Sequence, residues 1–206
     1  MYTARSKILK QTGKTDTEEE IAKIIFDLEQ NNDPELHHLY ITGAEYIEFE
    51  DRAGRPAKAL LIRIPYRSMP YLRKARSLVL PALEKKFRGS TVILVANRKI
   101  MSKHCKVVKG QSGQDRPRSR TLTNVHDAWL EEVVAPAHIA AKHTRLTASG
   151  QRVIKVFLDP LDRDEVEDKL DAYAEAYRKM THKRVLFEFA KPTAFQKLMI
   201  AHRQNN

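Results

Sequence analysis

Apolar residues recur along the chain with two periods, one typical of helices and the other typical of strands. Helical spacing predicts long helices over residues 17–30, 66–88, 122–135 and 166–180. Short apolar or alternating runs predict strands over residues 46–49, 59–64, 91–96, 144–146, 152–158 and 185–189. This mixture predicts an α/β (α+β) fold with a central, mixed, twisted sheet of about six strands, long packing helices and a protruding basic loop.

The order of the predicted elements is helix, hairpin, helix and strand, and it occurs twice. Two apolar strings echo each other, LIRI at residues 61–64 and VIKV at residues 153–156. We therefore predict two similar half-units whose strands share a sheet or pack closely, with chance similarity as the alternative. Pro81 lies inside the second predicted helix and should kink or split it, because proline removes a backbone donor.

The pattern predicts a single domain over residues 1–190, followed by a C-terminal extension over residues 191–206. A chain of 206 residues is long enough to bury a core of its own. In the extension, Phe195, Leu198 and Met199 have the spacing of a short helix.

Basic residues outnumber acidic ones by 37 to 26, which gives a net charge of +11. Most of the excess lies between residues 98 and 158, where twelve basic residues stand against four acids. A smaller basic cluster begins the chain, at Arg5, Lys7, Lys10 and Lys14. Such a charge favours a polyanionic partner, and nucleic acid, anionic membrane and acidic protein all remain open at this point.

The basic loop at about 98–121 ends in the string RPRSRTLT, residues 116–123. Pro117 disfavours helix at the preceding residue, so an extended chain is expected here. In an extended chain Arg116, Arg118 and Arg120 would point the same way and form one row of guanidinium groups for phosphate. Thr121 or Thr123 would cap the following helix, whose N-terminus also attracts phosphate. The alternatives are a solvated loop and a nuclear import signal.

The sequence gives little indication of acid–base catalysis or metal binding. His126 and Asp127, with Glu131, could imitate acid–base machinery, but neighbouring helical residues point about 100° apart and no nucleophile motif accompanies them. His104 and Cys105 lack a partner pair at zinc spacing. One cysteine, no apolar leader and no apolar run of about 20 residues predict a protein of the cytosol or nucleus.

The string RPRSRTLTNVHDAWLEEVVAP at residues 116–136 closely resembles the signature of the eukaryotic-type "S seven" family of small-subunit ribosomal proteins. The resemblance continues in LEKKFRG at 83–89, RVIKVFLD at 152–159 and YRKMTHKRVLFEF at 177–189, and it covers roughly residues 2 to 189. Two departures stand out. Residues 99–115 lack a dense Lys/Arg run, which puts the strength of the RNA contact there in doubt, and the tail after residue 190 extends past the family's usual end.

The resemblance implies a non-catalytic component of the small (40S) subunit that binds ribosomal RNA (rRNA), contacts neighbouring small-subunit proteins, and supports subunit assembly and pre-rRNA processing. It implies a cytoplasmic location on ribosomes and a nucleolar one during assembly. The resemblance implies no cofactor, metal, membrane or small-molecule substrate. Combined with the charge pattern, it makes the following residues candidates for rRNA contact: Arg98, Lys99, Lys103, Lys106, Lys109, Arg116, Arg118, Ser119, Arg120, Thr121, Thr123, His126, Lys142 and Arg145.

Two further functions stay open from the sequence. One is a basic adaptor or ribosome-assembly factor that binds acidic protein surfaces. The other is an enzyme acting on RNA through His126, Asp127 and Glu131. Salt dependence separates the first from an RNA-binding protein, because each neutralised phosphate steepens the fall of affinity with salt.

Overall fold

The structure is a computed structural model that describes residues 3–10, 13–31, 34–52, 54–102 and 116–204. The chain divides into two compact units. The first unit comprises Met1–Glu48 and Ala57–Trp129, and the second comprises Phe49–Pro56 and Leu130–Asn206. Each unit is described by itself.

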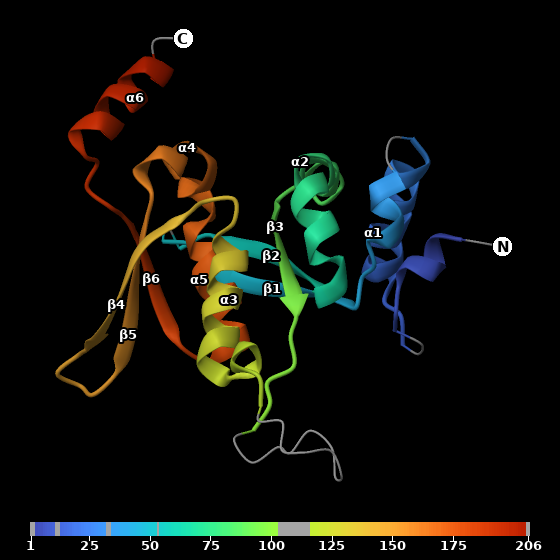
Figure 1. Cartoon of the computed structure of the whole chain (residues 1–206), viewed down its shortest axis with the longest axis horizontal. Coiled ribbons are helices and arrows are strands. Elements are labelled where there is room, and N and C mark those ends of the chain that lie inside the picture. The colour runs from blue at the N-terminus through green and yellow to red at the C-terminus, as the bar shows by residue number, and fades with distance from the viewer. Residues whose placement is uncertain (1–2, 11–12, 32–33, 53, 103–115, 205–206) are drawn as a thin grey trace. The chain divides into compact units, whose positions relative to one another are not determined.

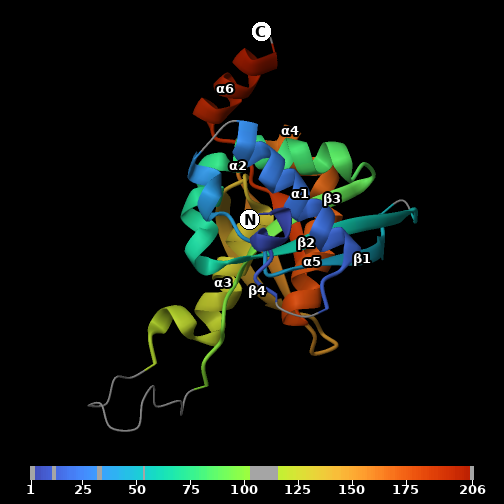
Figure 2. The same ribbon diagram turned by 90° about the vertical axis from the view of Figure 1, so that its right-hand side faces the viewer.

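The first unit packs two helices on one three-stranded sheet (Figure 1). Its elements are α1 (Asp16–Asn31), β1 (Gly43–Glu50), β2 (Pro56–Pro65), α2 (Met69–Lys86) and β3 (Ser90–Asn97), with short 3-10 helices η1 (Ala4–Lys7), η2 (Pro34–His38) and η3 (Tyr66–Ser68). The sheet order is β1-β2-β3, and β2 pairs with β3 in parallel. Figures 1 and 2 show α1 and α2 covering the same face of this sheet. That face and the helices enclose a core that includes Ile21, Leu60, Leu72, Val79 and Leu94.

Strands β2 and β3 are continuous apolar runs in the sequence, because both faces of each strand are buried. Residues 59–62 of β2 and 92–96 of β3 are all buried, whichever face they occupy. Pro81, expected to kink or split its helix, does not split it, because α2 continues from Met69 to Lys86. The cap of α1 uses Thr15 and Glu18, where the Thr15 N–H donates to Glu18 Oε2 at 3.1 Å.

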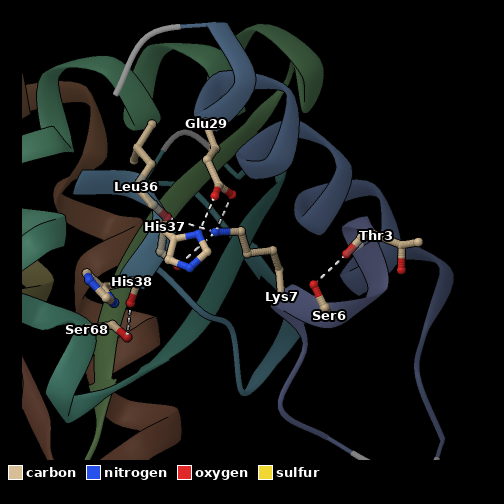
Figure 3. Close-up of polar contacts among 8 residues, drawn as sticks. All are labelled: Thr3, Ser6, Lys7, Glu29, Leu36, His37, His38 and Ser68. Carbon is tan, nitrogen blue, oxygen red and sulfur yellow. Dashed lines mark hydrogen bonds and ion pairs between the residues drawn. The ribbon is translucent and has the colours of Figure 1, made fainter. Parts of the chain in front are cut away.

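Lys7 is buried in the first unit, with none of its side chain exposed (Figure 3). Its Nζ lies 2.6 Å from Glu29 Oε2 and donates to the carbonyl oxygens of Leu36 at 2.9 Å and His37 at 3.1 Å. Glu29 Oε1 lies 2.7 Å from His37 Nδ1. The N-terminal segment is thus joined to α1 and η2 by one ammonium group. Lys7, one member of the basic cluster at the start of the chain, is therefore buried and does not add to the surface charge.

The second unit has the same kind of sheet, with order β4-β5-β6 (Figure 1). Its elements are the end of α3 (Leu122–Val134), β4 (Ile139–Leu146), β5 (Arg152–Leu158), α4 (Arg163–Val166), α5 (Leu170–Thr181), β6 (Arg184–Phe189) and α6 (Ala194–Gln204), with η5 (Pro160–Asp162) and η6 (Glu167–Lys169). β4 and β5 form the predicted antiparallel hairpin, which turns through Gly150 at φ +77°. β5 pairs with β6 in parallel.

The core of the second unit lies between α5 and one face of its sheet. Tyr173, Tyr177, Val156 and Phe187 are buried there, and the rings of Tyr173 and Phe187 meet edge to face at 6.5 Å. In Figures 1 and 2, α6 extends beyond the sheet of its own unit.

The α+β class and the six strands are confirmed among the described residues, and the element order repeats in the two units as the half-unit hypothesis requires. The single central sheet needs correction. The strands form two three-stranded sheets, each built from a hairpin and one parallel strand.

Candidate nucleic-acid interface

The carboxyl ends of β2 and β3 bring an aromatic ring and a guanidinium group together. The register of the parallel pair ends with Pro65 opposite Asn97, so the next residues, Tyr66 and Arg98, leave the sheet side by side. The Arg98 Cζ atom lies 4.8 Å from the centre of the Tyr66 ring, within the range of a cation–π contact. Tyr66 remains 60% exposed. An exposed ring with a cation beside it is a surface on which a nucleic-acid base can stack.

The two ends of the basic loop meet close to the carboxyl end of β3 (Figure 1). The Met101 N–H donates to the Arg120 carbonyl at 3.0 Å, and Arg116 Nη1 donates to the Met101 carbonyl at 2.9 Å. Arg120 Nη1 also lies 3.7 Å from Met101 Sδ. Met101 is only three residues from Arg98, a reach of about 10 Å even in a fully extended chain. The backbone near Arg120 is therefore held near the end of β3.

Arg116, Arg118 and Arg120 do not form the predicted extended row. Pro117 is extended, with φ −57° and ψ 138°, but residues Arg118–Arg120 form the 3-10 helix η4. Residues two apart in such a helix point in different directions, since a turn takes three residues. Arg116 is half-buried and bonded to Met101, whereas Arg118 and Arg120 are exposed. The physical reason is local: the Arg118 carbonyl accepts hydrogen bonds that close the turn.

Three donors converge on that carbonyl and fix the start of α3. They are the Thr121 N–H at 3.1 Å, the Thr121 hydroxyl at 2.7 Å and Asn124 Nδ2 at 2.7 Å. Thr121 has the extended backbone of a helix N-cap, and Thr123 is exposed in the first turn. No acidic residue occupies that turn, so the helix dipole presents an uncompensated positive end.

His126 serves packing rather than the surface. It is 7% exposed, and its ring stacks on Trp129 with centroids 5.7 Å apart and planes 20° apart. Trp129 Nε1 donates to the Ala96 carbonyl at 3.0 Å, near the end of β3. Trp129, with His126 stacked on it, thus attaches α3 to β3, the strand that Arg98 follows.

The other residues predicted to contact rRNA lie in several parts of the chain. Lys99 and Ser119 are exposed beside the residues already described. Lys142 and Arg145 are exposed on β4 in the second unit, opposite Val156 and Val153. Lys103, Lys106 and Lys109 lie outside the described residues.

In the described ranges, no three His, Cys, Asp or Glu side chains are grouped so that they could hold a metal ion. No helix in the part of the chain that the structure describes has the length and apolar character needed to cross a membrane.

Comparison with known proteins decides the family. The family model "Ribosomal protein S7e" matches residues 5–189. The chain belongs to the ribosomal protein S7e family. It is 41% identical over 194 residues to "Small ribosomal subunit protein eS7z" of Arabidopsis thaliana, which covers 92% of this chain and 97% of the relative. "Small ribosomal subunit protein eS7" of Avicennia marina is 42% identical with 92% and 98% covered, and that of Drosophila melanogaster is 39% identical with 89% and 94% covered.

Membership of the S7e family identifies a structural, non-enzymatic ribosomal protein. It therefore excludes the reading of His126, Asp127 and Glu131 as catalytic machinery. The resemblance of residues 116–136 to an S7e signature is confirmed, and the match extends through both units.

Sequence reasoning missed Tyr66 and Met101. Tyr66 carried a usable signal, because an aromatic residue directly after a buried parallel strand lies at the edge where α/β sheets place their ligands. Met101 carried none, since its role depends on a backbone hydrogen bond to a residue 19 positions away.

Proposed function

We propose that this chain is a structural component of the small ribosomal subunit that binds rRNA at a strand-end surface formed by Tyr66, Arg98, Lys99, Arg118 and Arg120. The names of its relatives, which are small-subunit proteins, support the placement in that subunit. The observation that carries the RNA contact is the hydrogen bond between Met101 and Arg120, which holds two exposed arginines near the end of β3.

The chemistry of this surface suits a sugar–phosphate backbone. Guanidinium groups bind phosphate oxygens in a bidentate manner, so Arg118 and Arg120 would neutralise phosphates from either side of η4. The N-terminal turn of α3, with the exposed Thr123, would attract a further phosphate. Tyr66 would stack on an unpaired base, as aromatic residues do in RNA recognition. Sequence specificity would then come from RNA shape rather than from base edges.

The same proposal includes a second contact and a wider role. Lys142 and Arg145 on β4 would bind another stretch of rRNA, and Lys103, Lys106 and Lys109 would add to the first. His126 would position α3 rather than bind RNA.

Residues 1–190 would act as one ribosomal-protein domain made of two half-units. The protein would enter the particle in the nucleolus, support pre-rRNA processing there, and remain on cytoplasmic ribosomes beside other small-subunit proteins.

The test is the salt dependence of binding to small-subunit rRNA fragments. Arg118→Ala with Arg120→Ala should lower the slope of log affinity against log salt by about 1.4 to 1.8, since each lost phosphate contact removes about 0.7–0.9. Arg145→Ala alone should lower it by about 0.7–0.9. The matched control is Arg163→Ala with Arg178→Ala, which removes the same charge from exposed ion pairs with Glu167 and Glu175.

Equal slopes for the strand-end variant and its control would contradict the RNA contact. Co-sedimentation with 40S particles gives a separate readout. If the variant left the particle while its RNA slope stayed at the wild-type value, the adaptor function that binds acidic proteins would replace this proposal.

A further inference from the structure

Helix α6 lies outside the region matched by the S7e family, which ends at residue 189. Its start is fixed by a reciprocal cap. The Thr193 N–H donates to Gln196 Oε1 at 2.9 Å, and the Gln196 N–H donates to Thr193 Oγ1 at 3.4 Å. This arrangement is a capping box, which satisfies donors that the first turn of a helix leaves open. The helix therefore begins at a defined residue.

One side chain of α6 also ties it to the body of the second unit. Gln196 Nε2 donates to Asp159 Oδ1 at 3.2 Å, and Asp159 lies directly after β5. Ile200, four residues on and thus on the same side of the helix, is half-buried. The direction in which α6 presents its other faces is set by this contact.

The neighbouring face of α6 presents apolar groups outward. Phe195 is 71% exposed and Met199 is 46% exposed, and their spacing of four residues places them side by side. Residues 190–206 also contain Lys191, Lys197 and Arg203 and no acidic residue. A helix that pairs an exposed apolar stripe with unopposed positive charge has the pattern of a helix that binds in a groove.

We propose that α6 docks, through Phe195 and Met199, into an apolar groove with an acidic rim on a neighbouring polypeptide. Lys191 and Lys197, both exposed, supply the charge that complements such a rim. A second copy of this chain fits poorly, because its net charge of +11 opposes the approach of a basic helix. A-form RNA has no groove that admits an apolar helix face, so RNA offers Phe195 at most one base on which to stack.

Site-specific crosslinking tests this docking in intact cells. The full chain with Phe195→benzoylphenylalanine is irradiated, recovered under denaturing conditions, and the joined peptide is identified. We expect one polypeptide, joined within a segment that combines apolar residues with net negative charge. The control is Arg178→benzoylphenylalanine, at an exposed position on α5 away from the proposed interface, which should lose that product.

Charge reversal supplies the second measurement. Lys191→Glu with Lys197→Glu, combined with the Phe195 crosslinker, should lower the yield about tenfold, because like charges would then face each other across the interface. An unchanged yield overturns the acidic rim. Attachment to RNA, lipid or a second copy, or no attachment at all, overturns the docking. None of these outcomes depends on the strand-end surface, because irradiation in cells does not require that the chain bind rRNA.

Discussion

The two units use the same architecture, but the carboxyl ends of their parallel strands differ. After β2 and β3 stand Tyr66 and Arg98, which are in contact with each other and leave the aromatic ring exposed. After β5 and β6 stand Asp159 and Ala190. Asp159 Oδ1 accepts hydrogen bonds from the Leu161 N–H and from Gln196, so the chain itself occupies that end. The first unit thus leaves its strand ends open to a ligand, whereas the second unit uses its strand ends to hold α6.

The terminal segments of the units are attached just as differently. The N-terminal segment is held by Lys7, whose buried ammonium contacts Glu29 and two carbonyl oxygens. Helix α6 is held by a neutral amide, Gln196, at a partly buried carboxylate. A buried charge makes the first attachment costly to break, whereas the second can be released at small cost.

Lys7→Met should have the largest effect on the comparison of the two units. Removing one partner of a buried ion pair leaves Glu29 without its ammonium partner, and the free energy of unfolding should fall by about 3–5 kcal/mol. Urea denaturation measures this loss. Lys58→Met, which breaks the exposed pair with Glu48, is the control and should leave stability essentially unchanged. Equal losses in the two variants would show that Lys7 does not hold the first unit together.

Asp159→Ala should lower the stability of the fold but not its affinity for RNA, and Tyr66→Ala should do the reverse. Asp159→Ala removes the cap of η5 and the contact to α6, so the free energy of unfolding should fall by about 1 kcal/mol while RNA affinity stays unchanged. Tyr66→Ala should leave stability unchanged and weaken RNA binding by about 1–3 kcal/mol, the range for one stacked base. If both variants altered the same property, the two strand ends would not differ in role.

The smallest predicted effect is a change in the pH dependence of stability at Glu29. Burial raises the pKa of Glu29, but hydrogen bonds from Lys7 and His37 lower it by more, so the pKa lies below its ordinary value of 4.5. Glu29 therefore stabilises the fold above pH 4.5, and that contribution is lost as the pH falls through the lowered pKa. Glu29→Gln should flatten the fall of stability below pH 4.5 in acid titrations monitored by circular dichroism. A variant that kept the wild-type profile would contradict the assignment.

The sequence predicted the order of elements well because each depends on nearby residues. The alternation of the hairpin around Gly150 and the four-and-three spacing through Tyr173 and Tyr177 identify β5 and α5 without any distant contact. Pro117 likewise had the predicted extended backbone. Proline restricts only its own backbone and that of the preceding residue. Pro117 therefore gave no indication of the turn that follows at Arg118.

The candidate site was harder to predict because its parts come from distant positions. Tyr66 and Arg98 meet through the register of β2 and β3, which no local pattern reveals. In the sequence Lys7 is only one member of a basic cluster, since composition cannot show that Glu29 and two carbonyl groups surround it. In both cases the missing information was which strand or helix lies beside which.

The hydrogen bond from Met101 to the Arg120 carbonyl also makes the polypeptide between them a closed ring. The entropy lost on closing a ring grows only with the logarithm of its length, at about 0.6 kcal/mol for each doubling. Insertions or deletions between residues 103 and 115 should therefore leave Arg118 and Arg120 where they are.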